Sequence, residues 1–135
     1  NVIRLLRRIR WWLTRRVGRG IVGRTMSSRK QRGYDSQRIV ANYLREHGWP
    51  FAEPVGAGRA GSDVTGIVGV DVEVKARRNL DLTGTLKQQA ARAAEGVLPL
   101  AVIRPDGYGP SKIGEWPAVV PLAVMVQLLR EAGYQ

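Results

Sequence analysis

The sequence contains no cysteine and a single histidine, His47, among its 135 residues. Without cysteine the chain can form neither disulfides nor thiolate metal sites, and it has no thiol nucleophile. One histidine gives a histidine-based zinc site or a serine–histidine triad little to build on. Catalytic or metal chemistry in this chain would therefore have to come from other side chains.

Long apolar runs are also missing. The longest uncharged apolar stretch, residues 116–126, contains two prolines and is far shorter than the roughly 20 residues that cross a membrane as a helix. Hydrophobic residues still make up 44% of the chain, which argues against global disorder. A chain of this length is sufficient for one modest core.

Acidic residues are absent from the first 32 residues, which carry 11 of the 22 lysines and arginines. The remaining residues balance 11 basic against 11 acidic side chains. We therefore expect a basic arm over residues 1–32 and a domain without net charge over residues 33–135. Such an arm would bind phosphates regardless of sequence and more weakly at high salt, with Arg29, Lys30 and Arg32 as contacts beside the domain.

Two other interpretations of the arm stay open. Residues 2–17 place apolar side chains at helical spacing opposite arginines, and such a basic amphipathic helix could lie on an anionic membrane surface. The arm could also be an extension foreign to the native protein, because Met26 would make an ordinary start just before the domain. Phosphate binding is preferred over membrane contact.

A strand expected over residues 70–76 alternates apolar and charged side chains. A period of two sends the two sets to opposite faces. The sets are Val70, Val72, Val74 and Ala76, and Asp71, Glu73 and Lys75. Asp63 begins the preceding run, which a tight connection through residues 66–69 would fold back as an antiparallel partner. Two carboxylates and an ammonium group would then converge.

This convergence suits phosphodiester hydrolysis. Mg²⁺ takes oxygen ligands and usually binds one or two carboxylates together with substrate phosphate oxygens. Asp63 and Glu73 could supply the carboxylates, and the main-chain carbonyl of Val74 could be a third ligand. Lys75 would orient the attacking water or stabilise the charge that develops. We predict Mg²⁺ as the cofactor, with Mn²⁺ as a substitute and no small-molecule cofactor; the alternative is a solvated strand edge with ordinary ion pairs.

Segments on both sides of these strands extend the pattern. Over residues 33–49, a glycine precedes an amphipathic helix that ends in Gly-Trp. A glycine-rich loop over residues 56–63 ends in Asp63. A polar Lys-Gln-Gln-Ala segment follows at residues 87–90. Together with Glu73-Val-Lys75, these segments resemble the PD-(D/E)xK nuclease superfamily, and within it the archaeal-type and phage Holliday junction resolvases. The resemblance covers residues 32–104.

The resemblance implies an α/β fold with a restriction-endonuclease-like core, a central mixed β-sheet flanked by helices. It implies branched DNA as the substrate, a homodimer, and the cytoplasm of a bacterial or phage-infected cell. The implied catalytic set is Asp63, Glu73, Lys75 and Gln37, with the metal on Asp63, Glu73 and Val74. Gln37 stands where the family often has a glutamate.

Basic and polar residues around the site are candidate DNA contacts. They are Arg38, Arg59, Arg77, Arg78, Lys87 and Gln89, in addition to the three in the arm. Each of the basic residues could instead belong to an ordinary solvated face. The neutral Gln37 keeps open a DNA-binding module with a degenerate site, and a related nuclease for linear or flapped DNA is a further alternative.

The rest of the chain predicts two further strands and two helices. We expect a helix over residues 82–95, with a small-residue face of Leu86, Ala90, Ala93 and Ala94, and a buried strand over residues 98–104. A crossover of this kind makes that strand a parallel neighbour of the strand at residues 70–76. A short strand at residues 116–120 and a helix between Pro121 and Gly133 complete the domain. Asp35 is expected to N-cap the first helix.

Overall fold

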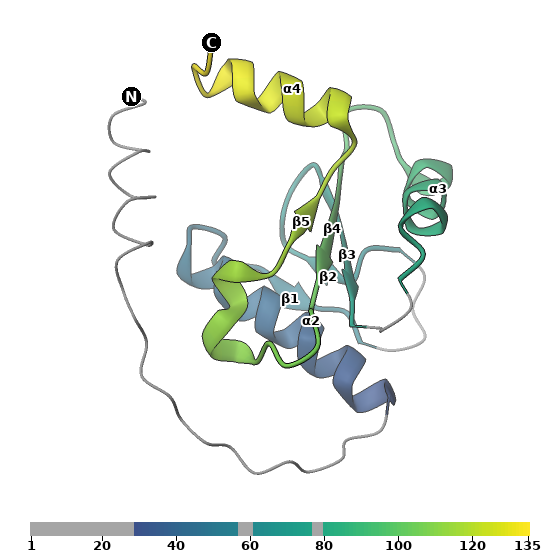
Figure 1. Ribbon diagram of the computed structural model, residues 1–135, viewed down its shortest axis with the longest axis vertical. Helices are drawn as coiled ribbons and strands as arrows, with labels where there is room; N and C mark the ends of the chain where they lie inside the picture. Colours follow the sequence, from purple (N-terminus) through teal and green to yellow (C-terminus); the bar gives the residue numbers. More distant parts are fainter. Residues whose placement is uncertain (1–28, 57–60, 77–79) are drawn as a thin grey trace. The chain divides into compact units, whose positions relative to one another are not determined.

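The computed structural model describes residues 29–56, 61–76 and 80–135 (Figure 1). Its elements are α2 (Arg29–Glu46), β1 (Glu53–Pro54), β2 (Val64–Thr65), β3 (Val70–Lys75), α3 (Leu82–Arg92), β4 (Leu98–Ile103), the 3-10 helix η1 (Pro110–Glu115), β5 (Ala118–Val119) and α4 (Leu122–Glu131). The chain divides into two compact units, and Met26–Pro121 forms the one that holds these strands. That unit ends before α4.

The strands form a mixed sheet in the order β1-β2-β3-β4-β5. β2 pairs antiparallel with both β1 and β3, β4 pairs antiparallel with β5, and β3 and β4 are parallel over their whole lengths, from Val70 beside Leu98 to Lys75 beside Ile103. Parallel neighbours need a crossover, and α3 provides it. The structure confirms the α/β class, the mixed sheet flanked by helices, and the predicted parallel pair.

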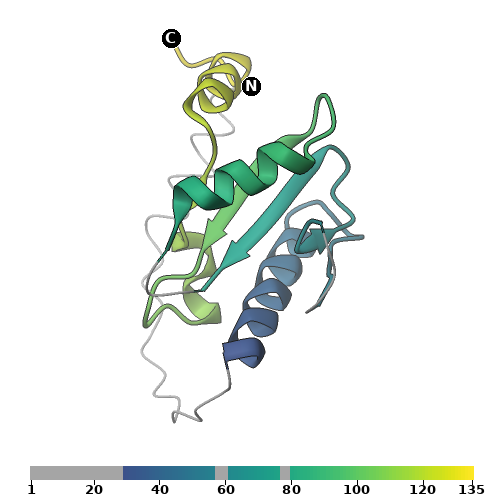
Figure 2. The ribbon, with the colours of Figure 1, turned by 90° about the vertical axis from the view of Figure 1, so that its right-hand side faces the viewer.

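Helices α2 and α3 cover opposite faces of this sheet (Figure 2). On the α2 face, Val72 and Val74 pack with Val40 and Ala41 of the helix and with Trp116, which follows η1. Val72 is fully buried. The apolar set of the alternating strand therefore forms the core, as its period of two predicts.

The α3 face of the sheet is polar but is also buried. Asp71 is 8% exposed and Glu73 is 5% exposed, so the interpretation of these carboxylates as a solvated edge is wrong. The predicted small-residue face of α3 is wrong as well, because its Ala90, Ala93 and Ala94 are exposed. The helix buries Thr85 and Gln89 instead, since a sheet face that carries carboxylates requires a polar partner.

Helix α2 already includes Arg29, so it begins well before the predicted cap at Asp35. Asp35 therefore lies inside the helix and does not N-cap it. Its carboxylate accepts a hydrogen bond from Gln31 Nε2 at 3.2 Å and lies 3.7 Å from Arg38 Nη2. Contacts at spacings of three and four support a helix from within, which explains why it extends across Gly33.

The connection between β2 and β3 contains two glycines with positive φ, Gly66 at 82° and Gly69 at 76°. Their surroundings differ. A Cβ atom on Gly66 would lie 1.8 Å from the main-chain oxygen of Phe51, whereas a Cβ on Gly69 would meet nothing within 4 Å. Gly66 thus lets two segments of main chain approach closely next to Asp63.

Replacing each glycine by alanine distinguishes the energetic penalty of the left-handed backbone from the penalty of steric overlap. We expect Gly69→Ala to lower the free energy of unfolding by about 1–2 kcal/mol, the usual penalty of a left-handed residue with a Cβ. Gly66→Ala carries that penalty plus a steric overlap, so its loss should reach about 3 kcal/mol or more. Urea unfolding of both variants measures the difference. Equal losses would contradict the close approach at Phe51.

Candidate active site

Asp63 stands directly before β2 and is bonded to β3 through both its main chain and its side chain. Its N–H donates to the carbonyl of Val72 at 2.7 Å, and its Oδ2 accepts the N–H of Val74 at 2.8 Å. Ser62 acts similarly, because its Oγ accepts the N–H of Val72 at 2.8 Å. Two side chains therefore continue the hydrogen-bond ladder where the short β2 has not yet begun.

This arrangement also orients the carbonyl of Val74. The N–H and C=O of one residue leave an extended strand on the same side. Because the N–H of Val74 reaches the Asp63 carboxylate, its carbonyl points to that side of β3 as well. The predicted third ligand therefore faces the same side of the strand as the predicted first one.

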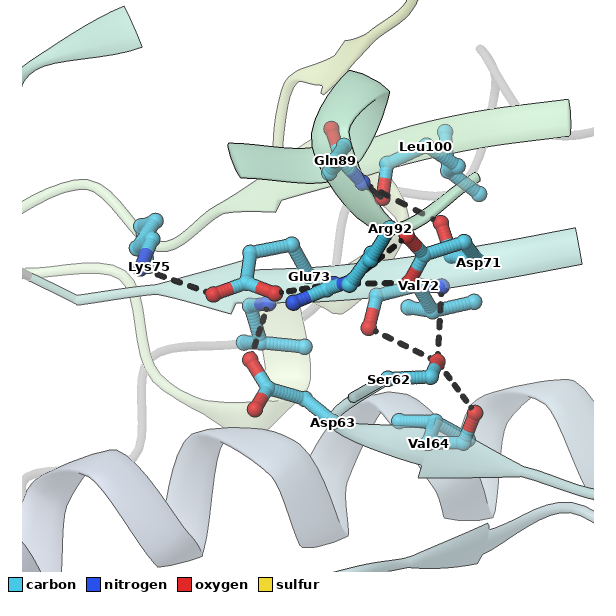
Figure 3. A network of polar contacts seen from close by, with 11 residues as sticks. Ser62, Asp63, Val64, Asp71, Val72, Glu73, Lys75, Gln89, Arg92 and Leu100 are labelled. Atoms are coloured by element: carbon cyan, nitrogen blue, oxygen red, sulfur yellow. Dashed lines mark hydrogen bonds and ion pairs between the residues drawn. The ribbon is translucent and has the colours of Figure 1, made fainter. Parts of the chain in front are cut away.

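Glu73 projects from β3 toward α3, with a cation on each of its oxygens (Figure 3). Oε1 lies 2.8 Å from Lys75 Nζ, and Oε2 lies 2.7 Å from Arg92 Nη2. The structure thus confirms that Glu73 and Lys75 point the same way, and it brings both into the neighbourhood of Asp63, whose pKa they influence. Asp63, Glu73 and Lys75 form one electrostatic cluster.

Arg92, near the end of α3, is a member of this cluster that the sequence interpretation missed. Its Nε and Nη2 donate to the two oxygens of Asp71 at 2.8 and 2.7 Å, and the same Nη2 donates to Glu73. Such a bidentate pair is among the strongest side-chain hydrogen bonds. A usable signal existed, because two buried acids on a strand require a counter-ion, and a residue three positions after Gln89 shares its helix face.

The surroundings of Asp63 shift the pKa of its carboxyl in opposite directions. Burial raises the pKa of its carboxyl above the ordinary value, and repulsion from Glu73 adds to the rise. The hydrogen bond from Val74 and the positive charges of Lys75 and Arg92 lower the pKa again without cancelling the rise. The hydrogen bond to Asp71 raises the pKa of Arg92, so this arginine is a permanent cation.

Gln37 lies at the entrance of the glycine-rich loop. Its Oε1 accepts the N–H of Gly56 at 3.2 Å, just before residues 57–60. The residues on either side of the loop are also joined, because the Val55 N–H donates to the Asp63 carbonyl at 3.0 Å. The structure therefore places Gln37 as an anchor of the loop that leads to Asp63.

Gln89 was expected to contact DNA, and that prediction is wrong. Its side chain is 0% exposed, and its Nε2 donates to the main-chain carbonyls of Asp71 and Leu100 at 3.2 and 3.3 Å. It therefore bridges β3 and β4 beneath α3, where no phosphate reaches it. The sequence of residues 87–90 alone does not reveal which of its two amides points inward.

The basic residues proposed for DNA contact divide by position. Arg29, Lys30 and Arg38 are exposed on α2, and Lys87 is exposed on α3. Arg32 pairs with Asp106 at 3.4 Å, which joins α2 to the segment after β4. Arg59, Arg77 and Arg78 lie outside the described residues, as does the arm before Arg29.

The oxygen donors at the site are the carboxylates of Asp63 and Glu73 and the carbonyl of Val74. In residues 29–56, 61–76 and 80–135, no three histidine, aspartate or glutamate side chains gather into a group that could hold a metal ion. A site here would therefore depend on two carboxylates completed by main chain, water or substrate. That donor set fits Mg²⁺, which commonly binds through one or two carboxylates and keeps several waters.

No family model matches this sequence, and neither a curated protein nor a solved structure matches it.

Across the part of the chain that the structure describes, no helix has the length and apolar character needed to cross a membrane.

Replacing Asp63 by asparagine should stabilise the metal-free protein at neutral pH. A carboxyl whose folded-state pKa is raised contributes stability below its unfolded pKa and loses it as pH rises through the folded pKa. Asp63→Asn removes this loss, and its amide oxygen can still accept the Val74 N–H. We expect the variant to exceed the wild type near pH 8, with the advantage shrinking toward about pH 4.

Chelator-treated proteins unfolded in urea across that range would measure the effect, with the exposed Glu95→Gln as the control for removing a negative charge. The explanation fails if Asp63→Asn is less stable than the wild type at neutral pH, or if its advantage grows as the pH falls.

Proposed function

We propose that this protein is a metal-dependent DNA endonuclease with a restriction-endonuclease-like core, and that it cuts four-way junctions. The observation that carries the proposal is the meeting of Asp63, Glu73 and Lys75 at the paired strands β2 and β3, with the Val74 carbonyl on the Asp63 side. The glycine-rich loop before Asp63 and the glutamine-bearing α3 behind Glu73 support the nuclease-like order of elements.

Each residue has a chemical task in this proposal. Asp63 and Glu73 hold Mg²⁺ or Mn²⁺ with the Val74 carbonyl, and the ion, when bound, makes water a stronger nucleophile and neutralises charge on the phosphate. Lys75, held 2.8 Å from Glu73, orients the attacking water or stabilises the negative charge of the transition state. Gln37 fixes the loop next to Asp63.

The substrate follows from charge and symmetry. Exposed basic residues on α2 and α3 (Arg29, Lys30, Arg38 and Lys87) supply phosphate contacts, and the basic arm adds a contribution that salt weakens. A two-fold homodimer would place two such sites for the two symmetric cuts that a junction needs. We propose that this takes place in the cytoplasm of a bacterial or phage-infected cell. A nuclease for linear or flapped DNA would use the same residues.

One observation favours a second function, a DNA-binding module without catalysis. Both oxygens of Glu73 are engaged by cations, and the amide oxygen of Gln37 is engaged by Gly56. If these contacts persist in the presence of a divalent ion, the positive charges of Lys75 and Arg92 repel the ion from Glu73. The same protein would then bind DNA through its basic surface alone.

Cleavage assays distinguish these functions. Purified protein with Mg²⁺ and end-labelled DNA should make paired symmetric nicks in a four-way junction and leave the matching linear duplex intact. Glu73→Gln and Asp63→Asn should each reduce the rate by about 10²–10³, the usual effect of losing a group that stabilises the transition state. Glu95→Gln, which removes an exposed carboxylate, should cut at the wild-type rate.

The other outcomes are equally informative. Cutting of both substrates would replace the junction-specific enzyme by a general nuclease. Binding without cutting, in Mg²⁺ and in Mn²⁺, would favour the binding module. Cutting that survives Glu73→Gln would show that the activity does not come from this site.

A further inference from the structure

We infer that Arg92 is a built-in competitor for the metal site: it holds Glu73 in the metal-free protein and must release it before Glu73 can bind the ion. This inference rests on the proposed function, because it concerns how the same site is loaded. The resemblance assigns no role to Arg92 or to its partner Asp71.

The contacts of Arg92 show which of its two partners is exchangeable. Nε and Nη2 both donate to Asp71, whereas Glu73 receives a single hydrogen bond from Nη2, at 2.7 Å. If Glu73 turns away, the bidentate pair with Asp71 remains complete. Asp71 is therefore the anchor of the arginine, and Glu73 is the partner that can leave.

Release is required because each oxygen of Glu73 already has a positive charge beside it. Lys75 Nζ lies 2.8 Å from Oε1 and Arg92 Nη2 lies 2.7 Å from Oε2. A divalent ion on the same carboxylate would face both positive charges at short range, where like charges repel strongly in a partly buried site. At least one of the two contacts must be given up, and Arg92 keeps a carboxylate partner when it does so.

The surroundings of Arg92 leave room for this change. A cleft of about 300 Å³ adjoins the Arg92–Asp71 pair. Its lining comes from the start of β3, the segment between α3 and β4, and the segment before Asp63. Besides the pair itself, the lining residues are Gly61, Ser62, Val70, Ala93, Ala94 and Val97. The guanidinium group is thus not enclosed on all sides, and it can keep its pair with Asp71 when Glu73 turns away.

Metal affinity tests the inference without relying on cleavage. Mn²⁺ would be titrated calorimetrically into chelator-treated wild type, Arg92→Gln, the double variant Asp71→Asn with Arg92→Gln, and Lys112→Gln. The double variant removes the arginine together with its anchor, so the net charge of the chain is unchanged and no unpaired Asp71 is left buried. Lys112→Gln removes one exposed positive charge from η1.

We expect the double variant and Arg92→Gln to bind Mn²⁺ about tenfold more tightly than the wild type, or tighter still, because no charge-assisted hydrogen bond to Glu73 has to be broken. Lys112→Gln should match the wild type. Urea unfolding in chelator confirms that each variant is folded, and the double variant supplies the test if Arg92→Gln alone does not fold.

Two failures can be told apart. The competition is refuted if the double variant binds Mn²⁺ no more tightly than the wild type, even if Arg92→Gln does bind more tightly. Arg92 would then act only as a charge near the site, and the metal site would stand. If none of the proteins binds Mn²⁺, the metal site itself is refuted, and the proposed function falls with the inference.

Discussion

The buried carboxylates of Asp71 and Glu73 constrain the rest of this fold. Moving an ionised group out of water is unfavourable by several kcal/mol unless it is paired and hydrogen-bonded. Here the fork of Arg92 satisfies Asp71 with two bonds and Glu73 with one, and Lys75 completes Glu73. Helix α3 must therefore present a polar face to the sheet, and the crossover between β3 and β4 must place Arg92 above both acids.

A second constraint comes from the shortness of β2, which spans only Val64–Thr65. Because β3 is longer, the side chains of Ser62 and Asp63 take over as acceptors for the N–H groups of Val72 and Val74. The Asp63 carboxyl is thereby held where burial and Glu73 both raise its pKa. Fold stability alone would not favour two repelling acids in this position, and a cation bound there would relieve the repulsion.

Much of this could be predicted from the sequence, because some patterns have a single physical solution. The alternation in β3 determines which side chains enter the core. A helix between two buried strands is the crossover that parallel neighbours need, so it predicts that they are parallel. The convergence of Asp63, Glu73 and Lys75 followed from these rules.

The errors have a shared cause. The interpretation of α3 assumed that alanines face the sheet, yet the sheet face carries Asp71 and Glu73, so Gln89 and Arg92 are turned inward instead. Which face of a helix is buried depends on what lies opposite, and a periodicity within the helix does not contain that information. Asp35 was misplaced for a similar reason, since its contacts with Gln31 and Arg38 extend the helix past the expected cap.

The location of a bound ion is the most direct test of the central claim, that Asp63 and Glu73 form one metal site controlled by Arg92. Anomalous diffraction from crystals soaked with Mn²⁺ would reveal it. The account predicts a manganese peak in contact with the Asp63 and Glu73 carboxylates, with Arg92 bonded to Asp71 and no longer to Glu73. A peak elsewhere, or none while the Arg92–Glu73 contact persists, would contradict it.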